Sequence, residues 1–339
     1  MKKILMTVAA VALSASAAFG ADLKLAKAPP PPPPPPSPWD VAFGGAVMSD
    51  YIWRGITQSG HNPSVAAYTE LRYNWSPSLQ FYGGISAESI QFPNRAAAEV
   101  DYYGGVRPTF GPVALDFGYW YYDYPGGSCF QNNNAPFVGG AFTNSTGPFT
   151  CNNGTLPNGA VAKRDWSFYE LYAKGVWTIN PQWAIGANYY GTPNILNTGS
   201  PGNYVSGTVK FTAPDAWKIW NAVGWYVSGE AGEQFLGTSD AFYGTGIPGN
   251  PFQNGVRYAD YATWNVGVGL TWKVFTFDLR YYDTNLSKSN CAVYTSSQTA
   301  SVSTSLLGTP NNPAGLSSNW CGSTVVAKLA FDMTLDSLK

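Results

Sequence analysis

Short and long connections alternate along the sequence, and they join segments in which every second residue is apolar. A period of two places successive side chains on opposite faces of a β-strand. We count twelve such segments, at 41–49, 64–74, 79–88, 99–109, 113–122, 168–178, 183–190, 203–212, 218–229, 258–272, 275–283 and 324–335. The pattern therefore predicts an all-β fold built from consecutive hairpins.

The connections differ in length in a regular way. Short ones lie at 75–78, 110–112, 179–181, 213–217 and 273–274, and long ones at 50–63, 89–98, 123–166, 191–202, 230–257 and 284–323. Because they alternate, every long connection falls at the same end of the sheet. Bacterial outer-membrane barrels have short periplasmic turns, long extracellular loops and an even number of strands. We predict a transmembrane antiparallel up-and-down β-barrel of about twelve strands over residues 39–339.

Composition supports a barrel over a water-soluble domain or a bundle of spanning helices. Only 12% of the residues are charged, whereas soluble domains have roughly 25%. Mean hydropathy is −0.14, and no apolar run approaches the roughly 20 residues of a spanning helix. A barrel strand needs only one apolar face, which reconciles these values. The net charge of −1 gives no reason to expect a nucleic-acid partner.

The first 38 residues are expected to lie outside the barrel. Residues 1–20 have the pattern of a cleaved secretory signal, with Lys2-Lys3, an apolar stretch and then Ala18-Phe19-Gly20. Residues 21–38 include a proline run at 29–36, which favours an extended polyproline II spacer. We interpret this segment as a periplasmic linker, with docking to a partner or to the cell wall as the alternative. Export of a barrel predicts that the chain is located in the outer membrane of a Gram-negative bacterium.

Charged residues of the predicted strands fall almost entirely on the parity opposite to the apolar residues. A barrel requires this separation, because an Arg or Lys facing lipid at mid-depth costs about 2–4 kcal/mol. These charged strand residues are expected either to line a narrow water-filled pore or to neutralise one another as a structural network, and we favour the pore. Leu171 and Ile185 should face lipid. The residues expected to line the lumen are Glu70, Arg72, Glu99, Asp101, Arg107, Asp116, Glu170, Lys174, Lys210, Asp278, Arg280, Lys328 and Asp332, with Glu88 at a strand end.

The four cysteines lie in two long connections, with Cys129 and Cys151 in one and Cys291 and Cys321 in the other. In an oxidising compartment, pairing within each loop is the economical arrangement, and pairing between loops stays open. The spacing does not fit a zinc site, and no phosphate-binding motif occurs. The single histidine, His61, has serines near it only in sequence. We expect no metal, no cofactor and no enzymatic activity.

Residues 49–59 read SDYIWRGITQS, which resembles the N-terminal motif of the TorF-type porin family of Gram-negative outer-membrane proteins. The resemblance covers most of 39–335 and implies a barrel with a pore. For the charged pair in the motif we favour an Asp50–Arg54 ion pair over ligand binding. Residues 21–30 also resemble rhizobial outer-membrane barrels of eight strands, but the strand count and the motif favour the TorF type. The matching residues are Ser49, Asp50, Tyr51, Arg54, Gly55, Gln58 and Ser59.

These features predict an outer-membrane porin, in contact with membrane lipid, for passive diffusion of small polar solutes or ions. The alternative is a non-conducting barrel whose disulfide-bonded loops serve adhesion or surface protection.

Overall fold

The computed structural model describes residues 38–130, 135–137, 140–142, 151, 156, 158–244, 248–249, 251–301, 309, 312, 315–335 and 337. The predicted signal at 1–20 and nearly all of the linker at 21–38 lie outside these residues. Among the described residues no helix is long and apolar enough to cross a membrane.

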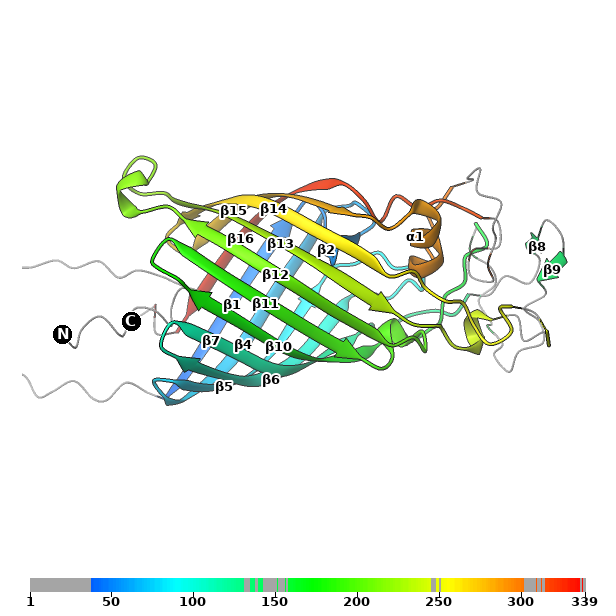
Figure 1. Cartoon of the computed structure of the whole chain (residues 1–339), viewed down its shortest axis with the longest axis horizontal. Coiled ribbons are helices and arrows are strands. Elements are labelled where there is room, and N and C mark those ends of the chain that lie inside the picture. The colour runs from blue at the N-terminus through cyan, green and yellow to red at the C-terminus, as the bar shows by residue number, and fades with distance from the viewer. Residues whose placement is uncertain are drawn as a thin grey trace, which may run out of the picture.

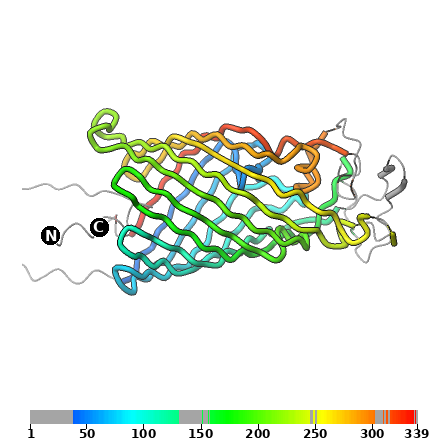
Figure 2. The backbone as a smooth tube through the Cα atoms, viewed as in Figure 1, coloured from blue at the N-terminus to red at the C-terminus, as the bar shows by residue number. Residues whose placement is uncertain are grey.

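Twelve strands close into one antiparallel barrel, so the predicted fold class is confirmed (Figure 1). Each strand pairs with its neighbour in sequence, and β1 also pairs with β16 to close the wall. The strands are tilted around the barrel (Figure 2). They are β1 (Trp39–Met48), β4 (Ser64–Ser76), β5 (Leu79–Glu88), β6 (Glu99–Phe110), β7 (Val113–Asp123), β10 (Phe168–Thr178), β11 (Trp183–Thr192), β12 (Gly202–Thr212), β13 (Gly224–Leu236), β14 (Tyr261–Trp272), β15 (Phe275–Thr284) and β16 (Thr324–Thr334).

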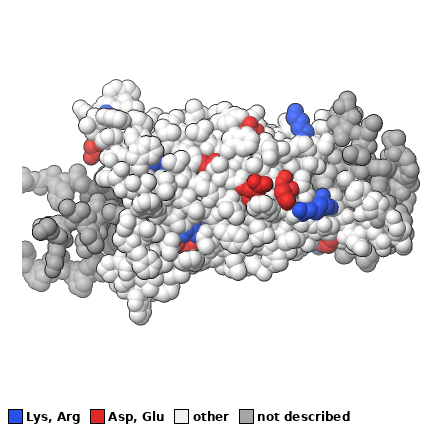
Figure 3. Space-filling model, in the orientation of Figure 1, with Lys and Arg blue, Asp and Glu red and all other residues white. Residues whose placement is uncertain are grey.

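The outer face of the wall is apolar. Leu171 is 57% exposed and Ile185 is 40% exposed, whereas Glu170, the next residue along β10, is fully buried. Most of the visible surface carries no charge, and the larger charged patches lie nearer the end with the long loops (Figure 3). A wall of this kind can face hydrocarbon with its backbone groups paired between strands.

Two glycines show how polar rings are accommodated on the inner face. A side chain at Gly44 would collide with the ring of Tyr68, whose hydroxyl donates to Asp332 at 2.9 Å. A side chain at Gly269 would likewise collide with Tyr226, whose hydroxyl donates to Asp278 at 2.8 Å. Glycine in the neighbouring strand lets each ring lie flat along the wall and reach its acceptor.

The predicted strand at 218–229 is displaced, because β13 runs from Gly224 to Leu236. Residues before it form a separate turn, in which Ile219 and Val223 pair and Trp220 and Asn221 both have positive φ. The alternation of polar and apolar residues continues through 230–236. The long connection predicted at 230–257 therefore begins only after Leu236. The short connection before β13 is correspondingly longer.

Within the long connections, the described residues include two small hairpins and one α-helix. A small hairpin, β2 (Ile52–Trp53) and β3 (Ile56–Thr57), occupies the first long connection. Helix α1 (Lys288–Thr295) occupies the sixth, while β8 (Ala135–Phe137) and β9 (Gly140–Phe142) pair within the third. These elements all belong to the end of the barrel that carries the long loops, which we call the long-loop end (Figure 1).

An apolar core packs the long-loop end. It joins Phe92, Trp166, Ile195, Tyr258 and Tyr294, which come from five different connections or strand ends. Both disulfides form within a loop, Cys129–Cys151 and Cys291–Cys321, as the economical pairing predicted. Cys291 and Cys321 are themselves members of this core. The loops at this end therefore form a packed layer.

Candidate functional site

The β2–β3 hairpin turns into the barrel at the long-loop end. Just before it, the hydroxyl of Tyr51 donates to Glu99 of β6 at 2.6 Å. Trp53 packs against the apolar core, with its ring 6.3 Å from the rings of Tyr122 and Phe168. The hairpin is thus held against the β6–β10 side of the wall.

Arg54, at the tip of the hairpin, reaches the strands of the barrel wall. Its Nη1 and Nη2 donate to the two carboxylate oxygens of Glu170 in β10 at 2.8 and 2.7 Å, and Nη1 also donates to Gln234 of β13 at 2.9 Å. The guanidinium lies 4.9 Å from the ring of Tyr190 and 4.6 Å from that of Tyr204. Only 6% of its side chain is exposed, and Glu170 is fully buried. A two-point ion pair of this kind between an arginine and a carboxylate is strong as well as directional.

Gly55 brings the tip against the remaining wall. It has a φ of +77°, and a side chain there would collide with Thr284 of β15 and Thr263 of β14. Glycine is therefore required both by the turn and by the close approach of the tip to the side chains of these two threonines. The segment 51–55 departs from the barrel wall after β1 and before β4. It contacts β6 and β10 to β15. The hairpin therefore spans the lumen from the β1–β4 side to the opposite wall.

The space on the outer side of the hairpin is small. A cavity of about 20 Å³ lies among Trp53, Phe92, Trp166, Leu196 and Trp320, which is room for about one water molecule. Thr57 of β3 donates its backbone N–H to the carbonyl of Trp320 at 3.0 Å, so the disulfide-bonded loop 284–323 lies directly on the hairpin.

The ion pair expected between Asp50 and Arg54 is not formed. Arg54 pairs with Glu170, and Asp50 pairs with His61 and accepts hydrogen bonds from Thr57 and Ser59. The other motif residues shape the same loop. Gln58 donates to the carbonyl of Ile56, and Ser49 continues the pairing of β1 with β16 through Ala327. The motif therefore builds the base and the tip of the inserted hairpin.

His61 joins this loop to the loop above it. Its Nδ1 lies 2.7 Å from Asp50 and its Nε2 lies 2.9 Å from the carbonyl of Asn319. Both partners are acceptors, and only the protonated imidazole donates from both nitrogens. The hydrogen bond with Asp50 raises the pKa of His61, and burial opposes it. Since the folded-state pKa exceeds the unfolded value, the contribution is complete below about pH 6.5 and is lost as pH rises through the folded pKa.

We expect hydrogen exchange at 319–320 to speed up between about pH 5.5 and about pH 8.5, beyond the intrinsic effect of pH. The His61→Asn variant should lack this extra step, because asparagine tolerates the positive φ of residue 61 but does not titrate. An equal pH step in that variant would show that another group controls the contact.

Four of the predicted lumen residues form one network on the β4–β7 side of the inner wall. Arg107 donates to both carboxylate oxygens of Glu70 at 2.8 and 3.0 Å and to Asp116 at 3.3 Å. Arg72 donates to Glu70 at 2.6 Å, and the guanidinium of Arg107 lies 3.5 Å from the ring of Tyr82. The charges of these residues are thus largely balanced among themselves.

A second network lies across the barrel on β13–β15. Arg280 donates to both oxygens of Asp278 at 3.0 and 2.9 Å and to Asn265 at 2.6 Å. Lys174 and Lys210 lie instead over tyrosine rings, 4.3 Å from Tyr172 and 4.4 Å from Tyr226. In the described part of the chain, Lys174, Lys210 and Lys328 form no ion pair.

Two cavities adjoin these networks. One of about 360 Å³ reaches the turn 75–78 and is lined by Arg107, Asp116 and Lys174. The other, of about 210 Å³, lies beside the hairpin between Glu88 on one wall and Arg280 and Lys328 on another. The inner barrel therefore has space bordered by charged residues both near the short turns and beside the hairpin.

The last two predicted lumen residues, Glu99 and Asp101, lie beside Glu88 near the base of the hairpin. Sequence reasoning listed Glu88 only as a strand end, and it omitted Trp53, Gln234 and the two tyrosines that surround Arg54. The unusual Trp53-Arg54-Gly55 turn in the motif was the available signal. The partners on β11–β13 give no local signal, because only closure of the barrel brings them to Arg54.

The fold and the closed, polar lumen place the chain among outer-membrane β-barrels. Residues 33–146, about a third of the chain, match the model of a family described as "Bacterial protein of unknown function (Gcw_chp)". This range includes the inserted hairpin and the three acidic residues beside it. No curated protein is similar in sequence.

Solved structures with a similar fold include several outer-membrane proteins. LpxR from Salmonella typhimurium is 9% identical with a TM-score of 0.41, over 86% of this chain and 99% of that one. A FadL homologue from Pseudomonas aeruginosa is 11% identical with a TM-score of 0.39, over 87% and 89%. A loop L8 deletion mutant of OmpT from Vibrio cholerae is 12% identical with a TM-score of 0.34, over 87% and 98%. Similarity at this level assigns no activity to the chain.

The expectation that the chain has no enzymatic activity is wrong as a deduction from the barrel class. The similar barrels include an enzyme, since LpxR is a deacylase. The physical reason is that catalytic groups in a barrel can come from different strands and meet only on closure, so the lack of a local motif excludes little.

Proposed function

We propose that the chain is an outer-membrane diffusion channel for small polar solutes or ions, and that the β2–β3 hairpin holds it closed in the state described here. One observation carries this proposal: the hairpin crosses a lumen that is otherwise polar and hollow. A barrel filled by side chains alone would need no inserted segment, and its charges would leave no cavity of several hundred Å³. The cavities beside the hairpin supply the space for a solute path.

The contacts of the hairpin are suited to a gate. Its tip is held by polar groups, with one ion pair, one amide and the rings around Arg54, rather than by apolar packing on all sides. Such contacts have strict geometry, so they favour two discrete positions over gradual loosening. Release of Arg54 would leave Glu170 and Gln234 to be solvated by water that enters the lumen.

Ion preference in the open state is expected to depend on lysines. Arg72, Arg107 and Arg280 were predicted from sequence to line the lumen, but each of them has a carboxylate partner. Lys174, Lys210 and Lys328, which form no ion pair with other described residues, lie on the same inner wall and contribute positive charge along the path. Because Glu88, Glu99 and Asp101 also form no ion pair within the described residues, the lysines offset a negative field, and their removal is expected to favour cations.

We also propose the finer points of identity and location. The motif at 49–59 supports membership of the TorF-type porin family, and its residues build the inserted hairpin. The leader pattern at 1–20 supports export, and it places the short turns and the linker at 21–38 in the periplasm. The long loops then face the outside of the cell.

A second function is favoured by a separate observation. The apolar core and the Cys291–Cys321 disulfide tie the long loops into one layer over the hairpin. A layer of this kind suits a non-conducting barrel that presents a fixed surface for adhesion or protection. Measurement of conductance distinguishes this non-conducting barrel from the proposed diffusion channel.

The test is planar-bilayer recording from the purified mature chain. We expect rare or small openings in the native protein and a clear increase in conductance for Arg54→Ala, because the tip of the hairpin loses its attachment to the opposite wall. Replacement of Lys174, Lys210 and Lys328 by glutamine in the Arg54→Ala background should shift the reversal potential towards cations.

Arg257→Ala is the matched control. Arg257 is an exposed arginine at the same end, paired with Asp260 at 3.3 Å, and its side chain forms no hydrogen bond or ion pair with the hairpin among the described residues. Its conductance should equal that of the native protein. Absence of channel events in both the native protein and Arg54→Ala would refute the channel and favour the surface layer.

A further inference from the structure

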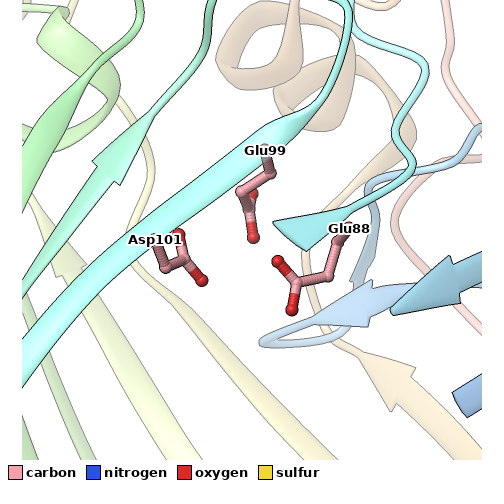
Figure 4. Close-up of side chains that lie close together, drawn as sticks. All are labelled: Glu88, Glu99 and Asp101. Atoms are coloured by element: carbon pink, nitrogen blue, oxygen red, sulfur yellow. The ribbon is translucent and has the colours of Figure 1, made fainter. Parts of the chain in front are cut away.

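We propose that Glu88, Glu99 and Asp101 bind one divalent cation, with calcium as the preferred ion, at the base of the inserted hairpin. Figure 4 shows the three carboxylates turned towards a common point. The proposal concerns binding alone, and it stands whether or not the barrel conducts.

The strands bring these residues together through register. Glu88 at the end of β5 lies directly opposite Glu99 at the start of β6, and Asp101 is two residues further on the same face. One oxygen from each carboxylate lies within 4.8 Å of the other two. Calcium binds oxygen ligands at roughly 2.3–2.6 Å, so ligands on opposite sides of the ion are separated by roughly 4.6–5.2 Å. These oxygens therefore lie no further apart than ligands on opposite sides of one ion.

Hydrogen bonding within the cluster is incomplete. Both oxygens of Glu99 accept a hydroxyl, from Tyr51 at 2.6 Å and from Tyr124 at 2.8 Å. Oδ1 of Asp101 and Oε2 of Glu88 accept no hydrogen bond, although Asp101 is only 3% exposed. A buried carboxylate oxygen without a partner is costly, and here it faces two further carboxylates. The other oxygen of Asp101, Oδ2, accepts a hydroxyl from Ser86 at 3.0 Å, and the two unpaired oxygens keep lone pairs available for a metal ion.

Charge sets this cluster apart from the other buried carboxylates of the barrel. Glu70, Glu170 and Asp278 are each paired with an arginine. Within the described residues, no lysine, arginine or histidine forms an ion pair with Glu88, Glu99 or Asp101. Adjacent carboxylates repel one another when ionised, and a divalent cation removes that repulsion.

The site has a route to water. Glu88 lines the cavity of about 210 Å³ beside the hairpin, together with Asp50 and Tyr51. Calcium takes six to eight oxygen ligands, so water from this cavity would complete the shell supplied by three carboxylates. Hard oxygen donors without nitrogen or sulfur favour calcium or magnesium over transition metals. The adaptable geometry of calcium suits a site with irregular carboxylate directions better than the octahedron that magnesium requires.

Calcium titration of the full-length protein in chelator-treated detergent solution tests the proposal, by calorimetry and by thermal unfolding. We expect one ion per chain and a rise in Tm on addition of CaCl2. Glu88→Gln and Asp101→Asn should each weaken binding by at least about tenfold, since even groups in the outer shell of a metal site contribute 10–100-fold. In EDTA both variants should be at least as stable as the native protein, because each removes one repulsive charge. Weaker calcium binding together with undiminished stability in EDTA separates loss of a ligand from simple misfolding.

Glu233→Gln is the matched control, because Glu233 is an exposed carboxylate near the long-loop end of β13 and lies outside the cluster. It should bind calcium as the native protein does. Absence of binding and of any Tm rise, or equal binding by Asp101→Asn, would overturn the site. Tighter binding of MgCl2 than of CaCl2 would overturn the assignment of calcium.

Discussion

Replacement of Arg54 by methionine is expected to lower the free energy of unfolding by about 3–5 kcal/mol, because it leaves the charge of Glu170 buried and unpaired. The carboxylate is fully buried and would retain only the hydroxyl of Tyr122, at 3.1 Å. Methionine keeps most of the volume of the arginine stem, so lost packing contributes little. Urea unfolding of the protein in phospholipid vesicles, followed by tryptophan fluorescence, measures the loss.

The double variant Arg54→Met, Glu170→Gln should recover most of that stability. Removing both charges of a buried pair is often nearly neutral, whereas removing one is not. Arg257→Met serves as the surface comparison, and its exposed pair with Asp260 should contribute below about 1 kcal/mol. If Arg54→Met matched Arg257→Met, the hairpin would not depend on this ion pair.

Loss of the Cys291–Cys321 disulfide is expected to reduce stability by about 3–4 kcal/mol, the chain-entropy value for closing a loop of this size. The two cysteines are 30 residues apart, and both are buried in the apolar core of the long-loop end. Alanine is the suitable replacement at both positions, since it adds no polar group to that core. Urea midpoints of the double alanine variant and of the native protein give the difference.

The same variant should expose the hairpin. Residue 56 pairs with Cys321, and Thr57 donates to Trp320, so a loosened loop withdraws these contacts from β3. Hydrogen exchange at 56–57 is expected to speed up in parallel with the fall in stability. A stability loss below about 1 kcal/mol would mean that loop packing alone holds the segment, contrary to the chain-entropy argument.

The wall of the barrel could be predicted from sequence, and the interior could not. Strand periodicity is local, so the alternation around Leu171 was enough to separate the faces of β10. The start of β13 was missed because Trp220 and Asn221 adopt positive φ, which reverses the chain within a stretch that still alternates. Side-chain period alone does not reveal such a turn.

The arrangement inside the barrel depends on contacts between distant residues. The motif residue Arg54 was recognised as notable, but Glu170 and Gln234 are 116 and 180 residues away from it. Asp50 and Arg54, which we expected to pair with each other, pair instead with His61 and Glu170. Glu88, Glu99 and Asp101 carry ordinary strand spacing, and only the register of β5 with β6 makes them a cluster.

The position of the hairpin in the chain also dictates an order of assembly. It is part of the connection between the first two barrel strands, yet it is anchored by residues from β10 to β15. Contacts across so long a stretch of chain form late, because their loop-closure entropy must first be met by the strands between them. Until β13 has paired, Arg54 has no Gln234 to bind, so the attachment of the tip is completed only after most of the wall has formed. The segment that closes the lumen is therefore the last to be fixed, although it is among the first to be synthesised.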